Sequence, residues 1–177
     1  MFLVFVLLTS CAQEPMQDTP FTPQPIKNHS LQIEETVQDF KITVTSLQKS
    51  YDRSLFDGGI PLQGGVHVQY CGPQDELTIF HSLPAYGISL YQEHNRIMSI
   101  NVSSDSGYET VLSKERFYED TWWAVGAAAW KGERPMLSAL PAGEYTIHIT
   151  INFHYCPLGI DVQEKFVHEM QIPVTLY

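Results

Sequence analysis

Two of the three cysteines in this chain lie in similar surroundings, each near a histidine that could share a metal ion with it. Residues 67–71 read His-Val-Gln-Tyr-Cys, and residues 152–156 read Asn-Phe-His-Tyr-Cys. Thiolate and imidazole groups suit copper or zinc, so metal handling through Cys71, Cys156, His67 and His154 is one hypothesis. The sequence has no close ligand spacing such as Cys-x-x-Cys or His-x-x-x-His. We therefore expect no metal and no other cofactor.

Local catalytic signatures are missing as well. The sequence has no Gly-x-Ser-x-Gly elbow, no His-Glu-x-x-His pair and no phosphate-binding glycine loop. His67, His148 and His154 fall on the polar positions of alternating runs, where solvated histidines are ordinary. The sequence therefore favours a protein that is not an enzyme.

Three tryptophans are close in the sequence and form the candidate binding region. Trp122, Trp123 and Trp130 follow Phe117 and Tyr118, and such rings could provide a platform for a sugar or a hot spot for a protein partner. Core packing is the interpretation that we favour for these rings. Trp122 and Trp123 could not share one face if this stretch is extended, because side chains alternate along a strand.

The N-terminus carries an export signal. Residues 2–8 are continuously apolar, a run too short to cross a bilayer but suited to a signal peptide. Leu8-Thr9-Ser10-Cys11 resembles the bacterial lipobox, which implies that Cys11 is acylated and that cleavage occurs before it. Ala12 follows, rather than the aspartate associated with retention in the inner membrane, so the resemblance implies the outer membrane in a Gram-negative host.

The next segment reads as a tether. Residues 11–30 contain four prolines among Gln, Thr and Asp, a composition that favours extended backbone. We therefore expect a signal peptide at 1–10, a lipidated cysteine and proline-rich tether at 11–30, and one domain at 31–177.

If Cys11 carries lipid as this resemblance implies, Cys71 and Cys156 remain in a compartment where disulfides persist. We favour a disulfide between them over a metal site. Tyr70 and Tyr155 would face inward by alternation, so the neighbouring sulfurs would lie outside the core and join strand ends.

Charge excludes one class of partner. Twenty acidic and ten basic residues give a formal net charge of -10, whereas nucleic-acid binding requires clustered cations. The same excess disfavours adsorption to anionic lipid, so membrane attachment requires the acyl anchor.

Alternating apolar and polar residues predict strands at 40–45, 66–70, 87–91, 98–102, 145–153 and 170–176. Pro173 predicts an edge strand, because proline donates no ladder hydrogen bond. Glycine-rich pairs, including Gly64-Gly65, predict turns between the strands. Helical potential is confined to residues 113–129, where Ser113 could cap one short helix.

Residues 140–145 (Leu-Pro-Ala-Gly-Glu-Tyr) resemble the tyrosine corner of immunoglobulin-like domains. Trp130-Lys131-Gly132 is similar to the Trp-x-Gly that precedes this corner in bacterial modules of that kind. The expected fold is all-β, an immunoglobulin-like antiparallel β-sandwich with at most one short helix.

The expected function is that of a membrane-anchored envelope lipoprotein, a non-catalytic module that binds an envelope or secreted protein. The alternatives are binding of a carbohydrate or small molecule by the three tryptophans, and metal handling by Cys71 and Cys156.

Overall fold

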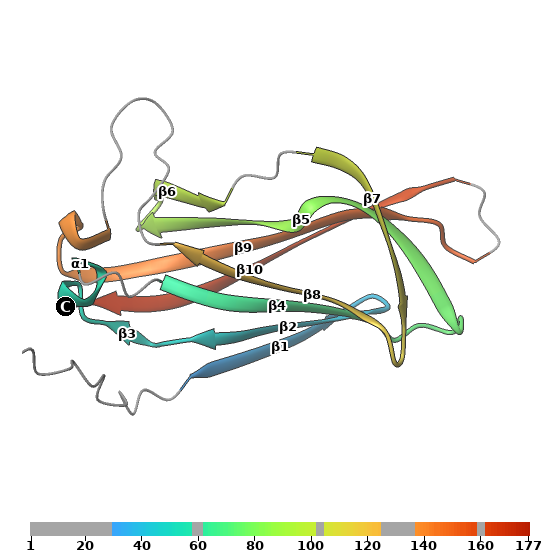
Figure 1. Cartoon of the computed structure of the whole chain (residues 1–177), viewed down its shortest axis with the longest axis horizontal. Helices are drawn as coiled ribbons and strands as arrows, with labels where there is room; N and C mark the ends of the chain where they lie inside the picture. Colours follow the sequence, from blue (N-terminus) through green and yellow to red (C-terminus); the bar gives the residue numbers. More distant parts are fainter. Residues whose placement is uncertain (1–29, 58–61, 102–104, 125–136, 159–161) are drawn as a thin grey trace, which may run out of the picture.

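The protein is an all-β sandwich in a computed structural model that describes residues 30–57, 62–101, 105–124, 137–158 and 162–177. Figure 1 shows most of its strands running along the long axis of the molecule in two layers, with β7 crossing them at a steep angle. The elements are β1 (Leu31–Val37), β2 (Phe40–Leu47), β3 (Ser50–Tyr51), α1 (Ser54–Asp57), β4 (Leu62–Tyr70), β5 (Glu76–Gln92), β6 (Asn95–Asn101), β7 (Asp105–Ser113), β8 (Phe117–Ala124), η1 (Leu137–Ala139), β9 (Gly143–Tyr155) and β10 (Glu164–Leu176). The predicted all-β sandwich is confirmed.

The two layers differ in size. Four strands pair in the order β1-β2-β4-β8, and the larger sheet has the order β3-β10-β9-β5-β6, with β7 also paired to β5. The described pairs are antiparallel except for β3 with β10, which run parallel over two residues. Strand β1 lies at an edge, pairs with β2, and has no fully buried residue.

The clearest predicted strand lies inside β9. Tyr145, Ile147, Ile149, Ile151 and Phe153 are all buried, while the residues between them are more exposed. This period of two buries one face of the sheet and leaves the other to solvent. The apolar face therefore fixes the register of β9 against both β5 and β10.

Phe40 is a centre of the core between the two sheets. Its ring packs edge-on against Phe153 and Phe166, with centroids 4.9 and 4.8 Å away. Tyr70 of β4 and Tyr155 of β9 also pack against it, at 5.8 and 5.2 Å. One phenylalanine from β2 thus joins both layers through aromatic contacts, which add stability beyond the area that they bury.

The predicted tyrosine corner is present. The hydroxyl of Tyr145 donates a hydrogen bond to the carbonyl oxygen of Pro141 at 2.9 Å, the backward contact that defines such a corner. The guanidinium of Arg53 donates to the next upstream carbonyl, that of Leu140, at 2.8 Å. The entry to β9 is therefore held from both sides.

Pro173 lies in β10 opposite Thr146 of β9. The other neighbour of β10 is β3, which pairs with Thr175 and Leu176 and does not reach Pro173. The proline therefore faces an open edge, as predicted.

Two local predictions are wrong. Residues 113–124 form no helix: Ser113 ends β7, and its Oγ accepts the backbone N–H groups of Glu115 and Arg116 at 3.1 and 3.0 Å in the turn to β8. A serine that could cap a helix makes the same local bonds in a turn. The pair Gly64-Gly65 lies inside β4 and not in a turn.

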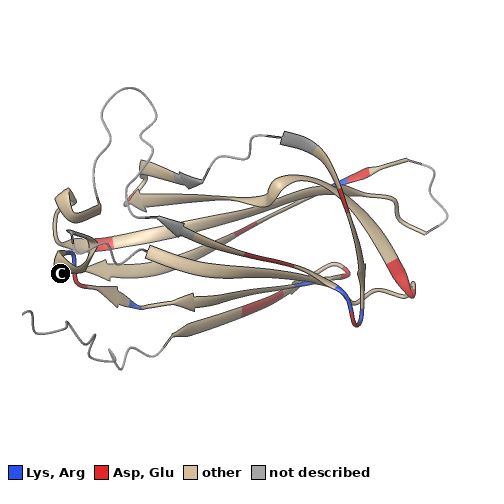
Figure 2. Ribbon diagram, in the orientation of Figure 1, with Lys and Arg blue, Asp and Glu red and all other residues tan. Residues whose placement is uncertain are grey.

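The predicted signal peptide, Cys11, the predicted tether up to residue 29 and Trp130 lie outside the described residues. Within the described ranges, no helix has the length and apolar character needed to cross a membrane. Figure 2 shows acidic residues along both sheets and fewer Lys and Arg residues, mostly near strand ends.

Candidate functional site

The predicted disulfide is not formed, because Cys71 and Cys156 are both free and exposed. Cys71 follows β4 in the four-stranded sheet, and Cys156 follows β9 in the other sheet. The preceding tyrosines point inward onto Phe40, so alternation turns the sulfurs outward on opposite layers. Packed sheets lie about 10 Å apart, whereas a disulfide needs Cα atoms within about 7 Å.

The two histidines of the metal hypothesis are placed differently from what a shared site would need. His67 Nε2 lies 2.8 Å from Glu119 Oε1, and His154 is exposed on β9. Among the residues that the structure describes, no three His, Cys, Asp or Glu side chains gather as metal ligands. The described arrangement therefore offers no support for metal handling.

Trp122 is a core residue. It is 5% exposed and covers Gly64, where an added Cβ would lie 2.7 to 2.9 Å from the indole ring. Trp123 pairs with Gln63 in the ladder, and Trp130 lies outside the described residues. Core packing is therefore confirmed for Trp122, and the three tryptophans do not together form an exposed platform.

The described chain has a different distinctive feature, a large bulge in β5. His81 pairs with Phe153 of β9, and the next pair joins Tyr86 to Ile151. Residues 82–85 of β5 therefore oppose the single residue Asn152. We call residues 82–85 the β5 bulge. On its other edge, β5 pairs with β7 up to Leu83 and with β6 from Ile88 onward, so the bulge lies where this edge changes partner.

His81 is a buried residue that supports the first residue of the bulge. Its ring is 6% exposed, and Nδ1 lies 2.6 Å from the carbonyl oxygen of Ser82. A carbonyl only accepts, so Nδ1 carries the proton and Nε2 accepts from the hydroxyl of Thr110 at 2.8 Å. One nitrogen of this buried ring therefore supports the bulge within β5, and the other holds β5 to β7.

Two tyrosines and one aspartate support the last residue of the bulge. The backbone N–H of Ala85 donates to the Tyr118 hydroxyl at 3.1 Å. The hydroxyls of Tyr86 and Tyr118 donate to Asp120 Oδ2 at 3.0 and 3.4 Å. Asp120 and Tyr118 belong to β8, so this network ties the bulge to the opposite sheet.

Burial raises the pKa of Tyr118 to about 12. Burial raises the pKa of Tyr86 further, and the negative charge of Asp120 adds to the effect. Both phenols therefore remain protonated near neutral pH and can donate to the carboxylate. The two phenols that support the bulge therefore keep their protons well above neutral pH.

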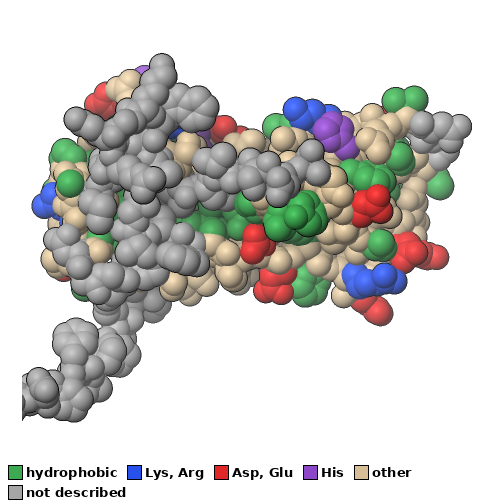
Figure 3. Space-filling model, turned by 45° about the horizontal axis from the view of Figure 1, so that its top comes forward, with side chains coloured by type: hydrophobic (Ala, Val, Ile, Leu, Met, Phe, Trp, Pro, Cys, Tyr) green, Lys and Arg blue, Asp and Glu red, His purple; other side chains and the backbone are tan. Residues whose placement is uncertain are grey.

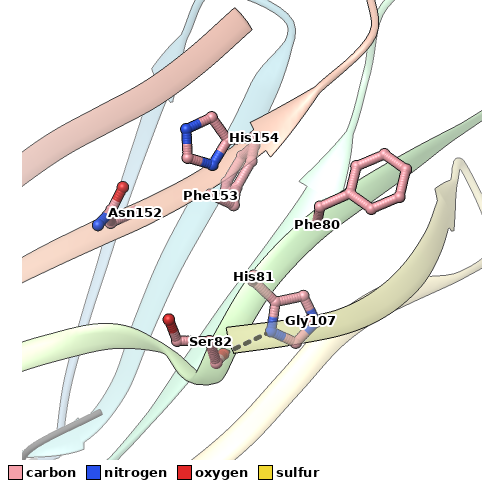
Figure 4. A pocket seen from close by; sticks show the side chains of 7 residues that line it. All are labelled: Phe80, His81, Ser82, Gly107, Asn152, Phe153 and His154. Atoms are coloured by element: carbon pink, nitrogen blue, oxygen red, sulfur yellow. Dashed lines mark hydrogen bonds between the residues drawn. The ribbon is translucent and has the colours of Figure 1, made fainter. Parts of the chain in front are cut away.

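A notch lies beside the bulge on the outer side of the larger sheet. One cavity of about 160 Å³ is lined by Phe80, His81, Ser82, Gly107, Asn152, Phe153 and His154. Figure 4 shows Asn152 and His154 on β9 and Phe80, His81 and Ser82 on β5 around it. A second cavity, of about 200 Å³, shares Ser82 and Asn152 with the first and continues along Pro84 and Tyr86.

Apolar side chains are exposed around this notch. Leu83, in the bulge, is 47% exposed, and Val167 is exposed beside Asn152 in the ladder. Figure 3 shows hydrophobic side chains next to scattered charged and histidine side chains on one face of the molecule. We call Phe80, Leu83, Asn152, His154 and Val167 the notch surface.

Sequence reasoning missed this site, although one signal pointed to it. Pro84 interrupts an otherwise alternating apolar stretch, and a proline inside a strand often marks a bulge. The predicted strand began only at residue 87, whereas β5 begins at Glu76.

Comparison of the chain with protein-family models, with curated proteins and with solved structures finds no match.

Proposed function

We propose that this chain is a lipid-anchored module of the bacterial cell envelope that binds another protein through the notch surface and catalyses no reaction. The observation that carries the proposal is the β5 bulge, which is held from below by His81 and Tyr118 while it exposes Leu83. Bulges of this kind re-aim side chains at functional sites. An apolar anchor on rigid backbone loses little entropy when a partner covers it.

The composition of the notch surface supports a protein as the ligand. Apolar Phe80 lines the first cavity with polar Asn152 and His154, exposed Val167 pairs with Asn152, and exposed Leu83 belongs to the bulge opposite Asn152. Protein interfaces combine an apolar centre with a polar rim in this way. The cavities of 160 and 200 Å³ are small for a drug-sized ligand, which usually occupies 300 Å³ or more.

The charge of the chain indicates the kind of partner. A net charge of -10 favours a partner with a basic rim around its own apolar contact, because complementary potentials speed association. Acylation of Cys11 would hold the module at the membrane, where more than one acyl chain gives stable anchoring.

The polar groups beside the notch support a role without catalysis. His81 is the buried base nearest to a hydroxyl, but both its nitrogens are committed to Ser82 and Thr110. A general base must reach a substrate proton, and this ring is nearly covered. We assign it to the support of the bulge.

Site-specific photocrosslinking tests the proposal. A photoreactive residue replaces Leu83 in cells that make the full chain, and Leu158, exposed between β9 and β10, is the matched control position. We expect one dominant adduct from position 83 and not from position 158. The captured partner, once purified, should bind the Leu83→Asp variant at least about tenfold more weakly than the native chain. Equal adducts at both positions, or equal affinity for both chains, would refute the notch surface as an interface.

Attachment to the membrane is tested separately by palmitate labelling of the native chain and of Cys11→Ser. We expect label on the native chain alone. An unlabelled native chain would remove the anchor from the proposal while leaving the notch surface to be judged by crosslinking.

A further inference from the structure

The outer face of the four-stranded sheet carries a second surface, larger than the notch. Two cavities of about 310 and 320 Å³ meet there, and they share Thr45 and His67. We call the combined depression the outer groove. It crosses β2, β4 and β8, and its volume falls in the range of ligand sites.

One end of the groove is lined by Gly65, which has no side chain of its own. Gly65 lies between Thr45 and Thr121 in the ladder, and an added Cβ would come within 2.7 Å of Thr45 Oγ1. The groove extends along β4 from Gln63 to Gln69. Those six steps span about 20 Å at the rise of a strand, which is room for a short linear chain.

An aromatic ring is fixed at the other end. Phe117 stacks on His67, with ring centroids 4.4 Å apart and planes 26° apart. Glu119 holds the imidazole from the other side, with Oε1 2.8 Å from Nε2. Phe117 lines the groove and remains 44% exposed, so part of its side chain is accessible to a ligand. The ring is therefore positioned before a ligand arrives.

The charges of the groove cancel. Its lining contains two lysines, Lys41 and Lys114, and two carboxylates, Glu34 and Glu119. Lys41 pairs with Glu34 at 2.9 Å. The chain as a whole has a net charge of -10, so this neutral surface differs from the rest of the molecule. It offers no attraction to a phosphate backbone or to a highly charged chain.

Much of the remaining lining consists of hydroxyl and amide side chains that both donate and accept hydrogen bonds. They include Thr43, Thr45, Thr121, Gln63 and Gln69. A sugar presents the matching chemistry, with hydroxyls that donate and accept and an apolar C–H face that covers an aromatic ring. A peptide strand would instead seek an unpaired sheet edge, whereas β4 is paired on both sides.

From these observations we infer that the outer groove binds a neutral oligosaccharide, with Phe117 stacking against one sugar ring and the threonine and glutamine side chains bonding its hydroxyls. This activity is independent of the notch surface, which lies on the other sheet. An envelope module with both surfaces would hold a glycan on one face and a protein on the other.

The test uses the full chain in detergent micelles and isothermal titration with uncharged hexamers of glucose (β-1,4 and α-1,4 linked) and of N-acetylglucosamine. A polygalacturonate hexamer serves as the charged comparison. We expect at least one neutral hexamer to bind, and its addition should shift the backbone amide signals of Thr43, Gly65 and Thr121 in NMR spectra.

Two groove variants and one control complete the test. Phe117→Ala should weaken the neutral hexamer at least about tenfold, since it removes the stacking ring. Thr43→Val, which keeps the side-chain shape, should weaken it by a smaller factor. Leu83→Asp should bind it like the native chain. Failure of every neutral hexamer, tighter binding of the charged one, or native affinity in Phe117→Ala would overturn the inference without affecting the crosslinking result at position 83.

Discussion

Gly64→Ala places one methyl group against a buried indole. The added Cβ would lie 2.7 Å from Cζ2 of Trp122, whereas ordinary contact begins at 3.4 Å, so the ring or the strand must move by about 0.7 Å. Overpacking of this kind typically costs about 1–3 kcal/mol. Alanine recovers part of that through lower chain entropy, about 0.4–1 kcal/mol, which leaves a net loss of about 1–2 kcal/mol.

The matched control is Gly87→Ala in β5, where nothing lies within 4 Å of the added Cβ. It should change the free energy of unfolding by less than about 1 kcal/mol, and in the stabilising direction. Urea unfolding followed by far-UV circular dichroism measures both variants. For a domain of this size, the Gly64→Ala loss corresponds to a fall in Tm of roughly 2–8 °C.

A double-mutant cycle with Trp122→Phe tests the stated cause. A smaller ring should tolerate the methyl group, so Gly64→Ala should cost less in the Phe background than in the native one. Equal costs in both backgrounds, or a Gly64→Ala variant as stable as Gly87→Ala, would show that the contact with the indole is not what makes glycine necessary here.

Three further outcomes follow from the fold. Burial raises the pKa of Tyr51 and of Tyr118 to about 12 from 10. Because the unfolded chain loses these protons at lower pH than the folded chain, the free energy of unfolding should fall as pH rises from 10 to 12. Absorbance titration of the folded chain at 295 nm should show these phenols ionising only above pH 11. Tyr145→Phe removes the hydrogen bond of the tyrosine corner and should lower the free energy of unfolding, measured in urea, by about 1 kcal/mol. A variant as stable as the native chain would show that this hydrogen bond does not contribute to stability. Cys71 and Cys156 should both react with maleimide in the folded chain, and mass spectrometry should show two additions. If neither cysteine reacts, the result would indicate that the two form a disulfide.

The strands were predictable where burial follows a period of two. In β9 every second residue from Tyr145 to Phe153 is apolar and buried, so the sequence carries the pattern locally. The tyrosine corner was equally local, because Pro141 and Tyr145 are four residues apart. Both features depend on a few neighbouring residues, which is why sequence reasoning found them.

The candidate sites depend on pairing between distant strands. The β5 bulge exists because His81 and Tyr86 take partners in β9 that are only two residues apart, and no local pattern specifies that register. His81 occupies an apolar position and finds its hydroxyl partner 29 residues away. Alternation placed Tyr70 and Tyr155 inward correctly, but it could not say that the two cysteines follow strands of different sheets.

The turn predicted at Gly64-Gly65 was wrong for a related reason. Gly64 and Gly65 read as a turn, yet each makes room for a side chain from a neighbouring strand, Trp122 on one face and Thr45 on the other. Close approach between strands and turn formation both select glycine. Only the tertiary pairing distinguishes them.

The exposed edge strand β1 has a mechanical consequence for a chain anchored at Cys11, as proposed. Tension from the membrane would reach Leu31 first and act on the open end of the β1–β2 hairpin, so that hydrogen bonds would break one after another rather than together. Because β1 has no fully buried residue, it could peel away while the core remained folded. Its seven residues would then add about 25 Å of chain at full extension, letting the module reach a partner farther from the membrane.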